Sequence, residues 1–210
     1  MKIVVITPSK RDDNEIASVI QMFEAGLETL HVRKTRFSTK ELEEYIKEIP
    51  AHFHNRIIIH SHHRLALKYN LKGVHFTSTH LKQKLQLWWN TRMIYLRKPK
   101  LIKTISYKRA NDLYPEQKVK TDYCFLGTMF HNLNGELYSG FYTETVEAAI
   151  KKSGKLIYAR GGVNEKSVEL AYKLGFHGIA LYGHLWKNVS PFTKYIEFIR
   201  FCKEKNIPID

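Results

Sequence analysis

The sequence predicts an α/β protein with the (β/α)8 (TIM) barrel fold, formed by a single domain over residues 1–210. Eight short apolar runs alternate with segments that carry helical periodicity or helix-start signals, and no linker or change of composition separates them. Residues 156–186 show this alternation most clearly: a β-rich run ends at Gly161-Gly162, an amphipathic helix follows, and a second apolar run ends at Gly183. An open doubly wound sheet more often stops at five or six strands, so eight strands favour the closed barrel.

The strands are expected where Val, Ile and aromatic residues cluster between turn residues. The first six apolar runs lie at residues 3–7, 29–34, 56–61, 73–77, 100–106 and 122–130, and the last two lie within residues 156–186.

The helices between them are predicted from capping residues and periodicity. Asp12 and Asp13 are expected to cap a helix that stops at Gly26. Ser38 and Glu41 have the spacing of a capping box, which opens the next helix up to residue 50. Further helices are expected at residues 62–70, 81–96, 108–116 and 143–154, after Gly162, and at 191–206.

Charge is the most unusual property of the composition, with a net charge of +14. Residues 51–120 carry fifteen Lys or Arg and only two acids. This segment is either a face for nucleic acid or another anionic partner, or the solvated surface of an enzyme with phosphorylated substrates. The second interpretation is favoured because Lys82, Lys84, Arg92 and Arg97 scatter around a predicted helix rather than forming a stripe. We therefore do not expect nucleic acid as a partner.

The cysteines and the N-terminus point to a reducing compartment. Cys124 and Cys202 lack metal-ligand or CxxC spacing, so buried free thiols are expected. The apolar run near Met1 has five residues, too few for a signal or a membrane span. The sequence predicts a cytoplasmic protein without a membrane partner.

Phosphate binding is the chemistry that the closing segment favours. Glycines directly after a strand let backbone N–H groups converge, and the start of the next helix adds a positive dipole end. In (β/α)8 barrels a phosphate site often follows strands seven and eight. Gly161, Gly162 and Gly183 are therefore the predicted phosphate-binding residues, although many Gly-Gly turns only reverse the chain.

The chain resembles the thiamine-phosphate synthase (thiamine-phosphate pyrophosphorylase) and thiazole tautomerase (TenI-like) superfamily almost from end to end. The resemblance lies in the order and spacing of several short pieces: TLHVRK with STKEL, RIIIHS with LAL, GVHF, KTIS, DYCFLGTMF, ARGGV and GIALYG. It implies an enzyme of thiamine biosynthesis that holds a small phosphorylated thiazole. In a synthase member, the thiazole is joined to a pyrimidine diphosphate with Mg²⁺, and pyrophosphate is released.

The same resemblance, together with strand parity, gives five expected substrate-binding positions. Arg33 matches an arginine after strand two, His75 a histidine of strand four and Ser106 a serine of strand five. His31 faces the same side as Arg33 by strand parity, and the family match also points His60 inward.

The Mg²⁺-binding half of the family pattern is altered. His60-Ser61 stands in place of the family's Asn-Asp, and residues 77–80 contain no carboxylate. The lysine expected two places after Arg33 is Thr35, with Lys34 one position early and pointing to the opposite side. Mg²⁺ is the family's metal, but its oxygen ligands are missing from these positions. The open alternatives are a metal-independent tautomerase-like isomerase, and a non-catalytic phosphate-binding barrel with a basic partner-binding face.

Histidines offer two further hypotheses. His131, three residues after Thr128, is the candidate for proton transfer, or else an ordinary surface residue. The inward-facing His31, His60 and His75 either ligate Zn²⁺ or another transition metal, or are neutral and line a polar pocket.

Three aromatic or basic features allow two interpretations each. Arg160 contacts the phosphate or pairs with an acid between strand and helix. Trp88-Trp89 cover a homodimer contact or pack on the barrel. Tyr182 and Trp186 cover the phosphate pocket or pack at its rim.

Overall fold

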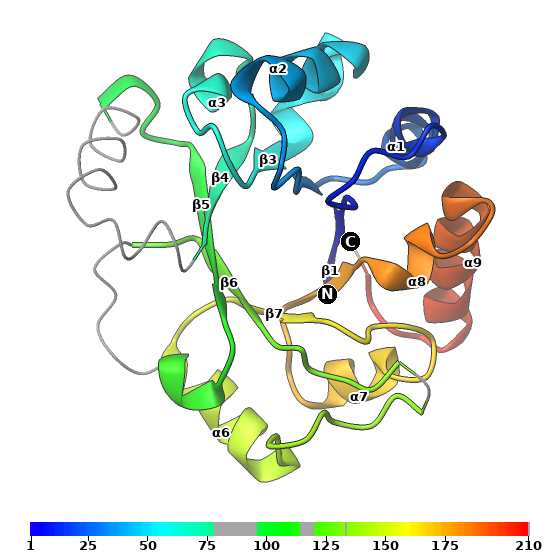
Figure 1. Cartoon of the computed structure of the whole chain (residues 1–210). Helices are drawn as coiled ribbons and strands as arrows, with labels where there is room; N and C mark the ends of the chain where they lie inside the picture. The colour runs from blue at the N-terminus through cyan, green and yellow to red at the C-terminus, as the bar shows by residue number, and fades with distance from the viewer. Residues whose placement is uncertain (78–95, 114–119, 133, 210) are drawn as a thin grey trace. The chain divides into compact units, whose positions relative to one another are not determined.

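The computed structural model of the chain describes residues 1–77, 96–113, 120–132 and 134–209. Eight strands follow one another in sequence order around a closed barrel, with helices between them (Figure 1). The predicted (β/α)8 barrel is thereby confirmed. The chain divides into two compact units, residues 6–105 (the N-terminal unit) and residues 1–5 with 106–210 (the C-terminal unit). The prediction of one domain stays a prediction.

The N-terminal unit contains three complete strands and most of a fourth, joined by short helices. Its strands are β2 (Leu30–Val32), β3 (Ile57–Ile59), β4 (Gly73–Phe76) and the first part of β5 (Ile102–Tyr107). Its helices are α1 (Glu15–Glu24), α2 (Thr39–Glu48), the 3₁₀ helix η1 (Ala51–Arg56) and α3 (Leu65–Lys68).

The C-terminal unit contains the other strands and the longest described helix. Its strands are β6 (Tyr123–Leu126), β7 (Ile157–Arg160), β8 (Gly178–Leu181) and β1 (Lys2–Ile6) up to Val5. Its helices are η2 (Ala110–Leu113), α6 (Thr143–Ser153), α7 (Val168–Lys173), α8 (Gly183–Trp186) and α9 (Pro191–Glu204).

Strands form at the predicted places because their residues are apolar on both faces, as parallel sheets require. In β3 all three isoleucines are fully buried. Strand β8 pairs in parallel with β1, in a register that places Gly178 opposite Lys2. A side chain at Gly178 would come within 2.7 Å of the Tyr158 ring, so glycine leaves room for the tyrosine.

The helix caps agree only in part with the prediction. The capping box is confirmed, because the Glu41 amide donates to Ser38 Oγ and the Ser38 amide donates to Glu41 Oε2. The caps at Asp12 and Asp13 are wrong. Helix α1 has Asn14 at its N-cap without a side-chain cap bond, and Asp12 Oδ1 instead accepts the Asn14 amide, just before the helix.

Two other boundaries also differ from expectation. The sixth strand ends at Leu126 rather than at residue 130, because Gly127 takes a φ of +136° and Phe130 pairs with Leu137 in an isolated antiparallel bridge. After Pro50 the chain continues as η1, which was not predicted. The predicted helix at 81–96 and its Trp88-Trp89 pair lie almost entirely outside the described residues, as does the end of the helix expected at 108–116.

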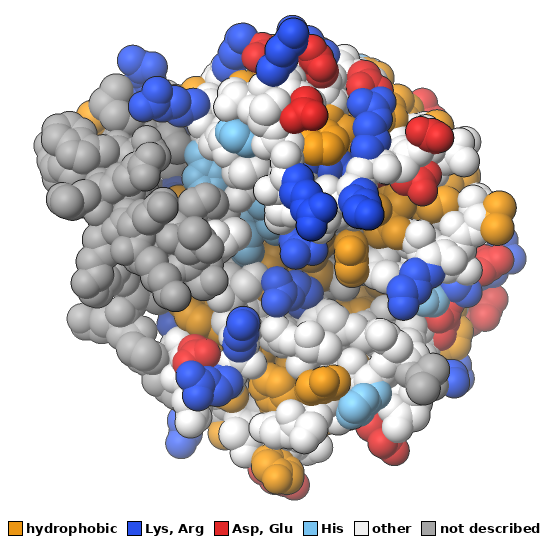
Figure 2. All heavy atoms as spheres, viewed as in Figure 1, with side chains coloured by type: hydrophobic (Ala, Val, Ile, Leu, Met, Phe, Trp, Pro, Cys, Tyr) orange, Lys and Arg blue, Asp and Glu red, His pale blue; other side chains and the backbone are white. Residues whose placement is uncertain are grey.

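Both cysteines are free and buried, as predicted. Burial raises the pKa of each thiol, Cys124 and Cys202, to about 12, so neither is a thiolate near neutral pH. Lys and Arg side chains are scattered over the visible surface and mixed with Asp and Glu (Figure 2). Among the described residues, no helix is long and apolar enough to cross a membrane.

Candidate functional site

The predicted phosphate turn lies directly after β7 in the C-terminal unit. Gly161 and Gly162 have φ values of +86° and +73°, the left-handed region that disfavours other residues. A Cβ atom on Gly162 would lie 1.9 Å from the Phe130 carbonyl oxygen, and one on Gly161 would lie 2.9 Å from Thr128. Glycine is therefore required at both positions by conformation and by the close approach of residues 128–130.

The carbonyls of this turn are used, whereas its amides are available. The Phe130 amide donates to the Gly161 carbonyl at 3.0 Å, and Ser167 Oγ donates to the Gly162 carbonyl at 3.0 Å. Within the described part of the chain, neither the Gly161 nor the Gly162 amide has a hydrogen-bond partner. Half-buried amides without partners at the carboxyl end of a strand can bind an anion.

The third predicted phosphate residue, Gly183, is the first residue of α8, close behind β8. The strand order puts β7 and β8 side by side in parallel. Glu165 fixes α8 from the side, because its Oε2 lies 3.2 Å from His184 Nε2 and its Oε1 lies 3.0 Å from Lys194 Nζ of α9. A glycine turn after the seventh strand and a short extra helix after the eighth are the arrangement in which barrels of this kind often bind phosphate.

The Arg160 guanidinium makes two hydrogen bonds that neither interpretation of the sequence included. Its Nη1 donates to Ser106 Oγ and its Nη2 donates to the Gly127 carbonyl, each at 3.1 Å. The predicted Ser106 is therefore bonded to Arg160, a link that no sequence spacing indicated. A guanidinium held by β5 and the end of β6 places a fixed positive charge next to the glycine turn.

His131 lies in the loop that covers the turn. It is exposed, with its ring 4.7 Å from that of Tyr138, and its amide donates to the Glu136 carbonyl. The loop contacts the segment after the turn, since Asn164 Nδ2 donates to the Asn132 carbonyl at 3.0 Å. Exposed Thr128, beside Gly161, is a hydroxyl that sequence reasoning did not select. The proton-transfer role of His131 stays a prediction.

In the N-terminal unit, His31, His60 and His75 meet in one buried cluster. His31 Nδ1 lies 3.0 Å from His60 Nε2, and the His60 and His75 rings stack with centroids 4.1 Å apart. One potential ligand atom from each histidine lies within 4.8 Å of the other two. The strand parity expected from the sequence thus brings these three side chains together.

Burial determines the charge of this cluster. It lowers the pKa of His31 to about 3, with the positive charge of Lys72 as a smaller cause. Burial also lowers the pKa of His60 well below its usual value, and the neighbouring histidines and Arg33 add to the effect. At neutral pH the His31 and His60 rings are therefore neutral, and each can donate or accept a hydrogen bond or bind a metal.

Arg33 and Lys34 lie on opposite sides of the chain, as strand alternation predicted. The Arg33 amide donates to Thr7 Oγ1 at 2.9 Å, and its charge acts on the histidine cluster. Lys34 is fully buried on the helix side, where its Nζ donates to Glu15 Oε2 at 2.6 Å. Tyr45 of α2 donates to the other oxygen of the same carboxylate at 2.5 Å. Lys34 therefore stabilises the helix layer rather than reaching a ligand.

Ser61 is a second residue that the sequence did not select as a site. Its Oγ is buried and has no hydrogen-bond partner in the described part of the chain. A buried hydroxyl that bonds to no described residue can donate a hydrogen bond to a bound molecule. Ser61 directly follows His60, at the position where the family resemblance expects a carboxylate.

At the positions after β3 where the family resemblance expects oxygen ligands for Mg²⁺, the chain has His60 and Ser61, and neither carries a carboxylate. Magnesium prefers oxygen ligands in octahedral geometry, and carboxylates usually supply one or two of them. The one cluster of metal-ligating side chains found among the described residues consists of the three histidines and includes no carboxylate. We therefore derive no step through Mg²⁺.

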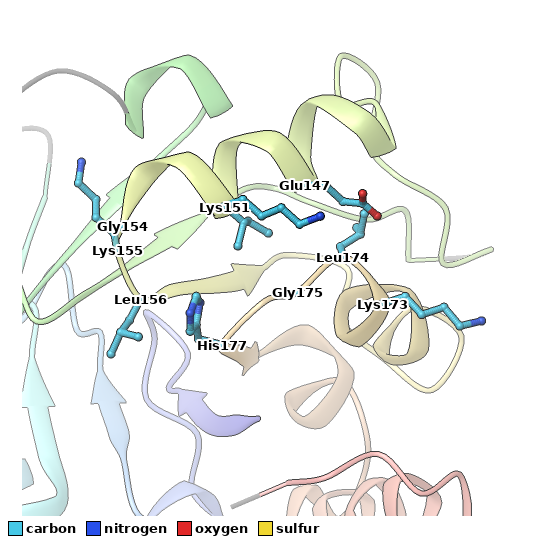
Figure 3. A pocket seen from close by; sticks show the side chains of 10 residues that line it. Glu147, Lys151, Gly154, Lys155, Leu156, Lys173, Leu174, Gly175 and His177 are labelled. Carbon is cyan, nitrogen blue, oxygen red and sulfur yellow. The ribbon is translucent and has the colours of Figure 1, made fainter.

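A pocket of about 490 Å³ in the C-terminal unit lies away from the glycine turn. It is bounded by Glu147 and Lys151 of α6, and by Leu156 and His177, which come just before β7 and β8 (Figure 3). The pocket therefore opens at the amino ends of these strands. Active sites in (β/α)8 barrels lie at the carboxyl ends, so this pocket is not the candidate site.

The closed barrel, with its glycine turn after β7 and short helix after β8, has the features of phosphate-binding (β/α)8 proteins. The model of the TMP-TENI family, thiamine monophosphate synthase, matches residues 3–185. The chain belongs to this family, which confirms the resemblance predicted from its motifs. A search of curated proteins found no match.

Solved structures similar to this chain include two thiamine phosphate pyrophosphorylases. The protein from Bacteroides thetaiotaomicron is 24% identical with a TM-score of 0.75, and covers 97% of this chain and 96% of its own. The protein from Pyrococcus furiosus is 19% identical with a TM-score of 0.73 and the same coverage. A geranylgeranylglyceryl phosphate synthase from Thermoplasma acidophilum is 13% identical with a TM-score of 0.65, covering 97% of this chain and 93% of its own. At these identities the similarity shows the fold.

Proposed function

We propose that this protein binds a small phosphorylated thiazole and acts in thiamine biosynthesis as a member of its family. The main support is the glycine turn after β7. Gly161 and Gly162 have left-handed backbone conformations, and their amides donate to no other described residue. A phosphate ester bound there would accept hydrogen bonds from these amides and from the start of α8 at Gly183. The nearby Arg160 guanidinium would favour the negative charge.

The N-terminal unit contains groups that suit a small heteroaromatic ligand. Arg33 provides a positive charge, and the buried Ser61 hydroxyl provides a hydrogen bond that no described residue uses. The rings of His31, His60 and His75 can stack on or hydrogen-bond to a heteroaromatic ring. These are the substrate-binding roles predicted from the sequence, and Ser61 adds to them.

For the reaction itself, the family is described as thiamine monophosphate synthase, and the resemblance implies coupling of the thiazole with a pyrimidine diphosphate. Because His60 and Ser61 replace the expected Mg²⁺ ligands after β3, we limit the proposal to thiazole phosphate binding. Isomerisation is the second candidate reaction, because the His131 loop is bonded to the segment after the glycine turn. A turnover assay of wild type and His131→Ala, with and without Mg²⁺, separates the two: EDTA-sensitive coupling would contradict our exclusion of Mg²⁺.

Isothermal titration with thiazole phosphate and with the unphosphorylated thiazole alcohol tests the binding proposal. We expect the phosphate ester to bind about 10- to 100-fold more tightly, because charged hydrogen bonds contribute about 1.5–3 kcal/mol each. Gly161→Ala should remove this preference. Gly154→Ala is the matched control, since its φ is +62° and a Cβ there meets no atom within 4 Å. Equal affinity of the wild type for both compounds would contradict the proposal.

A further inference from the structure

The three-histidine cluster of the N-terminal unit has ring nitrogens at separations that suit a shared metal ion. Zn²⁺ binds imidazole nitrogen at about 2.0–2.1 Å, so two nitrogens on a tetrahedral zinc lie about 3.3 Å apart. His31 Nδ1 and His60 Nε2 are 3.0 Å apart, and the ligand atom of His75 lies within 4.8 Å of both. Small side-chain movements would bring all three nitrogens to one ion.

The fold holds the three rings from three neighbouring strands. His31 belongs to β2, His60 follows β3 directly, and His75 belongs to β4, and these strands pair in parallel. The His60 amide is bonded to the Val32 carbonyl at 3.1 Å, which fixes its position beside β2. Ligands on rigid strands are positioned more accurately than ligands on loops.

The orientation of His75 is set by an outer partner. Its Nδ1 lies 2.7 Å from Thr104 Oγ1 of β5, and Thr104 is fully buried. A metal-ligating histidine almost always uses its second nitrogen in such a hydrogen bond, which fixes the ring and its tautomer. This contact leaves Nε2 as the ligating nitrogen of His75.

The surroundings indicate which ion fits. Neutral imidazoles suit Zn²⁺ and other borderline transition ions, whereas Mg²⁺ and Ca²⁺ require oxygen. Arg33 and Lys72 are the positive groups that act on the cluster, and no carboxylate belongs to it. These positive groups repel a bound cation, and an anion such as hydroxide in its fourth position would offset this repulsion. Three histidines with an open position also form a known kind of catalytic zinc site.

We propose that His31, His60 and His75 form a Zn²⁺ site with three protein ligands and one open coordination position, for which Thr104 is the positioning residue. This proposal does not depend on thiazole phosphate binding.

Cobalt substitution tests the site directly. Protein without a polyhistidine tag is stripped with chelator, dialysed, and titrated with Co²⁺ and then with Zn²⁺. We expect about one Co²⁺ per chain with the visible absorption of four-coordinate cobalt, lost on addition of Zn²⁺. Thr104→Val keeps the side-chain volume and should weaken Zn²⁺ binding about 10- to 100-fold. His75→Ala should weaken it by more than Thr104→Val does.

The control variants are His52→Ala, which removes an exposed histidine of η1, and His177→Ala, which removes the histidine before β8. Both should bind Co²⁺ like wild type. Circular dichroism of each variant tests whether it is folded. If His75→Ala does not fold, the titration of the wild-type protein still decides whether the metal site exists. The proposal is overturned if the wild-type protein shows no four-coordinate cobalt spectrum. It is also overturned if this spectrum persists in folded His75→Ala, or if it is lost in His52→Ala. Thiazole phosphate binding is measured separately, so failure of one proposal leaves the other standing.

Discussion

At the scale of single residues, Gly162 is the glycine at which an added side chain would be least tolerated. Its φ of +73° disfavours any L side chain, and a Cβ atom would meet the Phe130 carbonyl oxygen at 1.9 Å. Gly154 has a similar φ of +62° but open space around it. Substitution of Gly154 therefore measures the free-energy cost of the left-handed backbone alone, whereas substitution of Gly162 adds the cost of the steric contact.

We expect Gly154→Ala to lower the free energy of unfolding by about 1–2 kcal/mol, the cost of left-handed backbone. Gly162→Ala should cost clearly more, because the chain must also move away from Phe130. Urea unfolding of the two variants measures the difference. Equal losses of unfolding free energy in the two variants would show that residues 128–130 move away from the turn without a further loss of stability.

The same scale shows what sequence could and could not reveal about the site. His31 was predicted to face inward by strand parity, because alternate residues of a strand share a face, and His60 and His75 were predicted to do so by the family resemblance. The bond between Arg160 and Ser106 was not foreseen. Arg160 is the last residue before a glycine turn, where strand alternation ends and no longer tells which way a long side chain points.

At the scale of elements, the buried Lys34–Glu15 pair connects the end of β2 to α1, and Tyr45 adds α2. Desolvation lowers the pKa of Lys34, and the hydrogen bond to Glu15 opposes this effect. Removing one partner of a buried ion pair leaves the other charge uncompensated, which costs about 3–5 kcal/mol.

Lys34→Met should therefore destabilise the protein by about 3–5 kcal/mol in urea unfolding, and the double variant with Glu15→Gln should recover much of this loss. Arg11→Met provides the comparison. Arg11 and Glu48 also lie 2.5 Å apart, but both side chains are more than a third exposed, so its loss should cost less than about 1 kcal/mol. Similar losses for Lys34→Met and Arg11→Met would contradict the argument from burial.

Helices and strands could be predicted where the local sequence alone determines where they begin. Apolar runs rich in Val and Ile gave the strands, and the Ser38–Glu41 spacing gave a helix start that the structure confirms. The caps at Asp12 and Asp13 failed because an aspartate can accept a nearby amide in a turn as readily as at a helix start. The 3₁₀ helix η1 was missed because a single short turn after Pro50 has no period to detect.

At the scale of the whole molecule, the buried histidines link stability to pH. His31 has a pKa of about 3 in the folded chain and about 6.5 when exposed, so between these values the unfolded chain binds a proton that the folded chain does not. The stabilisation is fully present above pH 6.5 and is lost as pH falls toward 3. The slope approaches about 1.4 kcal/mol per pH unit for each such histidine.

Urea midpoints measured from pH 8 to pH 4 in the presence of EDTA, which removes competing metal, test this expectation. His31→Gln should flatten the decrease between pH 6.5 and 4, whereas His52→Ala, which removes an exposed histidine, should leave it unchanged. A wild-type midpoint that stays constant over this range would contradict the buried, neutral state of the cluster.

The enclosure of Lys34 has a practical consequence for following the motion of the chain. Its side chain is fully covered, while the side chain of Lys68 on α3 is 60% exposed. An acylating reagent will therefore modify Lys68 at once and reach Lys34 only during moments when α1 detaches. Mass spectrometry of the two acylated peptides over time would measure the rate of Lys34 modification, and this rate reports how often α1 detaches.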